Sequence, residues 1–76
     1  MRVHFDKIRA RMNIAFPKPM MKEIHSHILE VDFQMGSGRY LVHYFGSDNS
    51  YSLEYGGAMV LDTQNPDDIA DFILIK

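Results

Sequence analysis

The chain has 76 residues, of which 46% are hydrophobic, and it contains no cysteine. A chain of this length forms one domain, 1–76, and its hydrophobic content favours a folded domain over a disordered tail. Without cysteine, neither a disulfide nor a thiolate zinc site can supplement the core. The formal net charge of −2 conceals an uneven distribution of charge along the sequence.

Basic residues are concentrated at the start of the chain and acidic residues after it. Residues 1–22 carry six basic residues and one acidic residue, a net charge of +5, whereas residues 23–76 carry two basic and nine acidic residues, a net charge of −7. Such asymmetry usually concerns partners more than fold. The sequence shows neither the apolar run of a signal peptide nor that of a membrane span, so we expect a cytoplasmic protein.

The first predicted element is an amphipathic helix over about 5–15. Apolar side chains recur there at spacings of three and four residues, which places them on one face of a helix; they are Phe5, Ile8, Met12 and Ala15. Two prolines at positions 17 and 19 end this helix and favour an extended connection.

A hairpin is predicted next. From about Ile24 the apolar residues recur with a period of two, which predicts a strand over about 24–35. Gly36-Ser37-Gly38 is typical of a three-residue hairpin loop, and the returning strand spans about 39–46. This loop length sets Phe33 opposite Leu41, so the odd-numbered residues of the second strand face the core. The even-numbered residues then face outward; they are Tyr40, Val42 and Tyr44.

The rest of the chain predicts two short strands and a second helix. A strand over about 50–55 is set with Tyr51 opposite Phe45, because the alternative register would bury Glu54. Gly56-Gly57 suits a tight turn into a strand over about 58–61. Asn65-Pro66-Asp67-Asp68 is a strong helix start, since it combines an N-cap, a proline at the first position and two carboxylates near the helix dipole. The helix spans about 66–75.

The order of elements predicts a two-layer α+β fold with an N-terminal helix, a three- to four-stranded antiparallel meander and a C-terminal helix. One face of the sheet supplies the core, and one or both helices pack on it.

No constellation of side chains predicts catalysis, a metal or a cofactor. His25 and His27, two apart on a strand, would point the same way as zinc ligands do, but a third ligand is missing from that face. Ser26 lies on the opposite face from both histidines, and the glycine pairs open no helix as phosphate-binding loops do. We therefore expect a protein that is not an enzyme and needs no cofactor.

The outward face of the predicted sheet is the first candidate for function. Tyrosines bordered by carboxylates resemble a protein-recognition surface, because tyrosine offers a large contact area at low entropic cost. The predicted protein-binding residues are Tyr40, Val42, Tyr44, Glu30, Asp32 and Glu54. A non-enzymatic module that docks on a larger protein or ribonucleoprotein complex is the expected function. By analogy of size alone, it would act as a phage or mobile-element inhibitor does, anti-CRISPR proteins among them.

The basic N-terminal segment supports two alternatives. A regulator that binds RNA or DNA would contact phosphates through basic side chains, and the candidates are Lys7, Arg9, Arg11, Lys18 and Lys22. A homo-oligomer would instead bring the basic helix of one copy against the acidic sheet of another.

Overall fold

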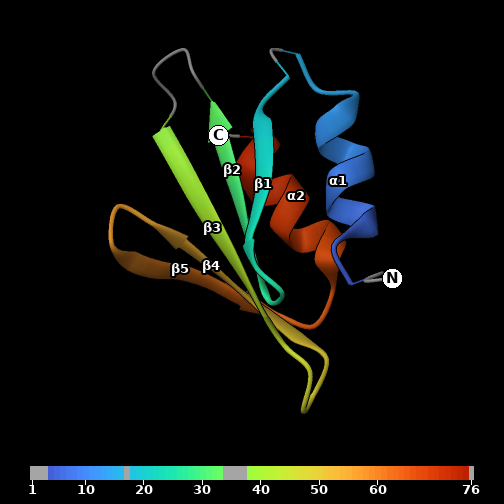
Figure 1. The fold of residues 1–76 in the computed structure, drawn as a ribbon, viewed down its shortest axis with the longest axis vertical. Helices are drawn as coiled ribbons and strands as arrows, with labels where there is room; N and C mark the ends of the chain where they lie inside the picture. The colour runs from blue at the N-terminus through green and yellow to red at the C-terminus, as the bar shows by residue number, and fades with distance from the viewer. Residues whose placement is uncertain (1–3, 17, 34–37, 76) are drawn as a thin grey trace.

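The computed structural model describes residues 4–16, 18–33 and 38–75, except for the side chain of residue 75. Within these ranges the chain forms two helices and five strands, drawn in chain order in Figure 1. The elements are α1 (Asp6–Asn13), β1 (Met20–His25), β2 (Ile28–Phe33), β3 (Gly38–Phe45), β4 (Ser50–Tyr55), β5 (Ala58–Thr63) and α2 (Pro66–Ile75). The strands form one antiparallel meander in the order β1-β2-β3-β4-β5.

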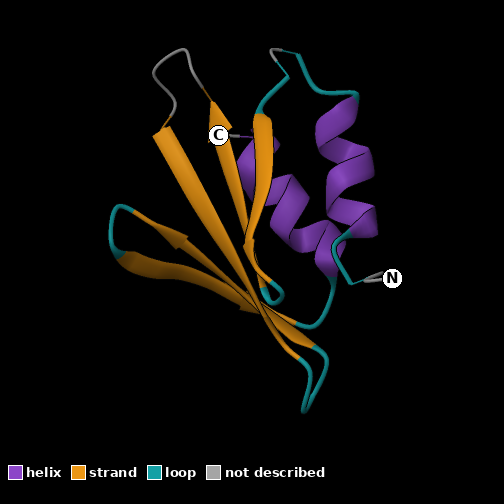
Figure 2. Ribbon diagram, viewed as in Figure 1, coloured by secondary structure: helices purple, strands orange, loops and turns teal. Residues whose placement is uncertain are grey.

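Both helices lie on the same side of this sheet, side by side, and none of the described elements forms a layer on its other side (Figure 2). The core lies between the helices and the sheet, because that is where apolar side chains from both layers meet. It consists of Phe5, Ile8 and Met12 from the α1 region, Leu29, Val31, Tyr40, Val42, Tyr51 and Leu53 from the sheet, and Ile69, Ala70 and Ile73 from α2.

The predicted two-layer α+β architecture is confirmed, but the number of strands is not. The predicted strand over 24–35 covers the end of β1 and all of β2, which are joined by a tight turn at Ser26 and His27. The sheet therefore has five strands instead of three or four. Ile24 and Ile28 on the two sides of this turn are separated by an even number of positions, as in a continuous strand, so apolar spacing there does not reveal the break. The proposed loop at residues 36 and 37 lies outside the described residues.

The predicted pairing of β2 with β3 is wrong by three residues. Phe33 pairs with Gly38, Val31 with Tyr40 and Leu29 with Val42. Because side chains alternate between faces, an odd shift exchanges the two faces of a strand. In β3 the even-numbered residues consequently face the helices and the odd-numbered residues face away.

The pairing of β3 with β4 is also shifted, by one residue, since Tyr51 pairs with Tyr44 and not with Phe45. The reasoning about Glu54 nevertheless assigns the faces of β4 correctly. Tyr51 and Leu53 are buried against the helices, and Glu54 lies on the other face, where it contacts His43. The cost of burying a carboxylate is therefore a reliable guide to this strand.

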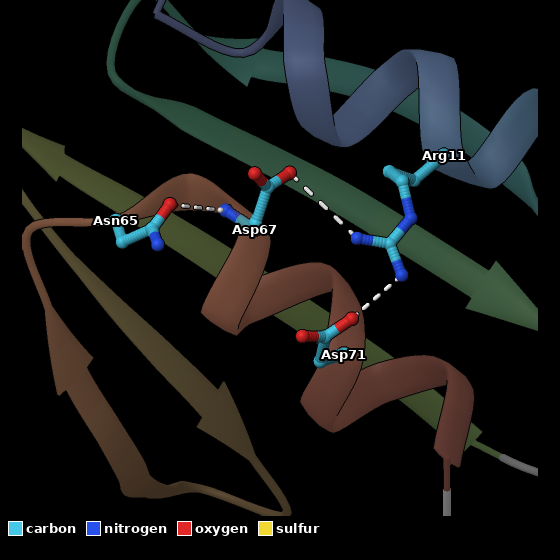
Figure 3. A network of polar contacts seen from close by, with 4 residues as sticks. All are labelled: Arg11, Asn65, Asp67 and Asp71. Atoms are coloured by element: carbon cyan, nitrogen blue, oxygen red, sulfur yellow. Dashed lines mark hydrogen bonds and ion pairs between the residues drawn. The ribbon is translucent and has the colours of Figure 1, made fainter.

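Polar contacts fix the start of α2 and join the two helices (Figure 3). The side chain of Asn65 accepts a hydrogen bond of 3.0 Å from the backbone N–H of Asp67, as the predicted N-cap requires. Arg11 of α1 donates to Asp71 at 2.6 Å and lies 3.6 Å from Asp67. The hydrogen bond with Asp71 is the main cause that raises the pKa of Arg11, so this side chain is held as a cation against α2.

Candidate functional site

The face of the sheet that the helices leave uncovered, here called the bare face, is the largest feature that the core does not use. Residues paired directly across neighbouring antiparallel strands share a face, so the register identifies its members. They are Met20, Lys22, Ile28, Glu30, Asp32, Arg39, Leu41, His43, Phe45, Ser50, Ser52, Glu54, Met59 and Asp62. Three large apolar side chains among them are 45–60% exposed, namely Met20, Phe45 and Met59.

Two side-chain contacts cross the bare face between neighbouring strands. Arg39 forms an ion pair with Glu30 at 3.0 Å, and the Nε2 atom of His43 lies 3.0 Å from a carboxylate oxygen of Glu54. These contacts hold the side chains in the middle of the sheet in place and leave Leu41 between them, because Leu41 pairs with both Glu30 and Glu54. The face therefore combines apolar side chains with oriented charges.

The predicted protein-binding residues divide between the two faces of the sheet. Tyr40 and Val42 are 2% and 0% exposed, and Tyr44 packs against the same core, so the prediction that they face outward is wrong. Burial raises the pKa of the Tyr40 phenol, as expected for a core side chain. The three predicted carboxylates do lie together on the bare face; they are Glu30, Asp32 and Glu54.

The basic residues of the nucleic-acid alternative are not gathered into one surface. Arg9 forms a 3.2 Å ion pair with Glu23, and Arg11 is held by two carboxylates of α2. Lys7 is exposed on α1, whereas Lys22 lies on the bare face opposite Glu30. Lys18 is exposed in the segment before β1. Two of these five basic residues, Arg9 and Arg11, are thus paired with carboxylates within the fold.

The histidines do not form the strand pair that the sequence predicts. His25 ends β1 and His27 lies in the following turn, with ring centroids 5.9 Å apart. His4 stacks on Tyr44 at 4.1 Å, and its Nε2 lies 3.1 Å from the carbonyl oxygen of Ser26. Among the described residues, no group of three histidines or carboxylates is arranged to hold a metal ion.

A hollow of about 550 Å³ opens at one end of the bare face. It lies where the turn between β3 and β4 approaches the end of β5, and Gln64 joins the two segments by donating a hydrogen bond of 3.1 Å to the carbonyl oxygen of Asp48. The hollow, here called the polar hollow, is lined by Phe45, Ser47, Asp48, Ser50, Ser52, Asp62, Thr63 and Gln64.

The sequence-based prediction missed Phe45, Met59 and Asp62 as surface residues of interest. Phe45 was placed in the core by the shifted register, and β5 was taken to end at residue 61. The signal that could have identified β3 correctly is weak, because apolar residues occupy both of its faces: Tyr40, Val42 and Tyr44 on one, Leu41 and Phe45 on the other.

Comparisons with protein-family models, with curated protein sequences and with solved structures gave no match to this chain. In the described part of the chain, neither helix has the length and apolar character needed to cross a membrane.

Proposed function

We propose that this protein is a small non-enzymatic binding module that docks on a larger protein complex through the bare face of its sheet. The observation that carries the proposal is the exposure of Met20, Phe45 and Met59 on a face that neither helix covers. These side chains lie on three different strands, β1, β3 and β5, so a partner that contacts all of them covers the width of the sheet.

The charged side chains of the bare face support the same proposal. They lie in the middle of the sheet, between Met20 on edge strand β1 and Met59 on edge strand β5. Glu30 is held by its ion pair with Arg39 and Glu54 by its hydrogen bond with His43, so a partner meets carboxylates that are already oriented. Such preorganisation lowers the entropic cost of association. By covering a functional site on its partner, a module of this kind acts as an inhibitor or a regulator.

Affinity capture with two matched variants tests the proposal. The protein is immobilised, a lysate of the cells that express it is divided into nuclease-treated and untreated halves, and retained proteins are identified by mass spectrometry. Phe45→Ala removes an aromatic ring from the bare face. Phe16→Ala removes the same ring from the link between α1 and β1, where Phe16 is fully exposed at 100%.

We expect a protein partner that survives nuclease, that is retained by the wild type and by Phe16→Ala, and that is lost from Phe45→Ala. Equal retention by both variants would contradict docking through the bare face. Loss of all retained material on nuclease treatment would indicate instead that the protein binds nucleic acid.

A further inference from the structure

The polar hollow at the end of the bare face has two walls of different chemistry. On one side is the ring of Phe45 on β3, which is 45% exposed, and on the other is the side chain of Asp62 on β5. Asp48 lies at the turn between β3 and β4 and contributes a second carboxylate. A ligand placed here would contact an aromatic surface and two negative charges together.

The described residues provide no cation to the two carboxylates of the polar hollow. Glu23, Glu30, Asp67 and Asp71, by contrast, each form an ion pair with an arginine. Asp48 and Asp62 instead accept hydrogen bonds from the neighbouring hydroxyls of Ser50 and Ser52. The hollow thus retains two negative charges on the surface proposed to meet a partner, and its charge complement is a cation.

The remaining polar groups of the hollow strengthen this preference. The hydroxyls of Ser50 and Ser52 donate to Asp48 and Asp62, and Gln64 donates to the backbone of Asp48. These donors already have acceptors within the protein, whereas the two carboxylates have further lone pairs for a ligand. A ligand that donates several hydrogen bonds fits such a surface better than an anion or an acceptor does.

We infer that the polar hollow receives an arginine side chain of the partner protein. This inference rests on the proposed function and names the chemistry that the bare face recognises. A guanidinium group carries a permanent positive charge, donates five hydrogen bonds and stacks on aromatic rings. It can lie on the ring of Phe45 while its N–H groups face Asp48 and Asp62. Lysine would satisfy the charge, but it lacks the planar group that matches the aromatic wall.

Titration with N-acetylarginine amide, followed by the backbone amide signals in NMR spectra, tests this inference. We expect saturable shifts at Ser47, Asp48, Ser50 and Asp62, with weak affinity because only one side chain is supplied. N-acetyllysine amide should bind more weakly. N-acetylcitrulline amide has nearly the same shape but no charge, and it should produce no saturable shifts.

Three variants locate the effect. Asp62→Asn retains an oxygen that accepts the bond from Ser52 and should weaken the binding of N-acetylarginine amide roughly fivefold, the upper range for an exposed ion pair. Phe45→Leu retains an apolar side chain and should weaken binding roughly two- to fivefold, because the cation–π contact is lost. Asp32→Asn removes a bare-face carboxylate that does not line the hollow, and it should have no effect.

The inference is overturned if the wild type shows no saturable shifts up to the solubility limit of N-acetylarginine amide. It is also overturned if citrulline binds as well as arginine, or if Asp62→Asn and Asp32→Asn behave alike. Any of these results, combined with a partner that depends on Phe45 in affinity capture, leaves docking through the bare face intact. Equal capture by the Phe45→Ala and Phe16→Ala variants would instead contradict the proposed function, whatever the titration shows.

Discussion

The two faces of this sheet belong to the same strands but differ in burial. Along β3, Tyr40 and Val42 are 2% and 0% exposed, whereas Phe45 on the opposite face is 45% exposed. The helices bury the first set, and nothing among the described elements covers the second. One face therefore supplies most of the stability, and the other can change its chemistry at little cost to the fold.

This difference explains how so short a chain could combine folding and recognition. A small domain buries a limited share of its surface, so it has few apolar side chains to spare. Here the core residues of both helices pack against four core residues of β3 and β4. All of them lie on a single side of the sheet. Apolar side chains left on the bare face are available for a partner.

The most severe test of the comparison is a pair of substitutions on β3. Tyr40→Ala should lower the free energy of unfolding by about 3–5 kcal/mol, the usual cost of deleting a buried aromatic side chain. Phe45→Ala should change it by about 1 kcal/mol or less, as expected for an exposed strand position. Urea denaturation followed by circular dichroism measures both. Comparable losses for the two variants would mean that the faces are not distinct.

Alkaline pH should also destabilise the buried face selectively. Burial is the main cause that raises the pKa values of Tyr40 and Tyr51, so the folded state holds their protons more tightly than the unfolded state does. Their contribution to stability is complete below the ordinary tyrosine pKa of about 10 and is lost as the pH rises through the raised values.

Denaturation at increasing alkaline pH measures this loss. The variant with both Tyr40→Phe and Tyr51→Phe serves as the control, because lysine titration remains in it while the two phenols are removed. Its stability should fall less steeply with pH than that of the wild type. An identical pH dependence would show that these phenols do not contribute.

A smaller effect is expected where α2 begins. Asn65→Ala removes the acceptor for the backbone N–H of Asp67 and should cost about 1 kcal/mol, the typical value of an N-cap. Asn65→Ser should recover most of that loss, because serine is also an effective cap. Thermal unfolding compares the three proteins, and equal melting temperatures for all of them would contradict a capping role.

The smallest effect is expected for the ion pair that joins α1 to β1. Arg9→Ala breaks the 3.2 Å contact with Glu23, but the Arg9 side chain is 35% exposed, so the loss should be at most about 1 kcal/mol and should shrink at high salt. Lys7→Ala, an exposed change of equal charge on the same helix, is the control. Denaturation at low and high salt measures the stability of both variants. An equal salt dependence of the two variants would contradict the ion pair between Arg9 and Glu23.

Local signals in the sequence determined the second helix well, whereas long-range register was harder to predict. Asn65 and Pro66 mark the start of α2 because capping and proline geometry depend only on neighbouring residues. The pairing of β2 with β3 depends on the number of residues between the strands, and an assumed loop of three residues exchanged the faces of β3. With apolar residues on both faces of that strand, hydrophobic alternation could not correct the error.

The candidate site was affected by the same error. Glu30, Asp32 and Glu54 are predicted on the correct face, because each stands next in the sequence to an apolar residue of the core, Val31 or Leu53. On β3 the two faces were exchanged. Tyr40 and Val42 face the core, where the prediction had Leu41 and Phe45. The polar hollow depends on β5 approaching the turn after β3, a contact that no pattern within one strand reveals.

The most direct test of docking through the bare face is the NMR response of methyl groups when the partner recovered by affinity capture is added. The methyl signals of Leu41 and Met59 report on the bare face, and those of Val42 and Leu53 report on the core. The signal of Ile14 reports on the link between α1 and β1. We predict that the signals of Leu41 and Met59 shift or broaden strongly while those of the other three change little. Strong changes at Ile14, with Leu41 and Met59 unaffected, would contradict the assignment of the bare face as the docking surface.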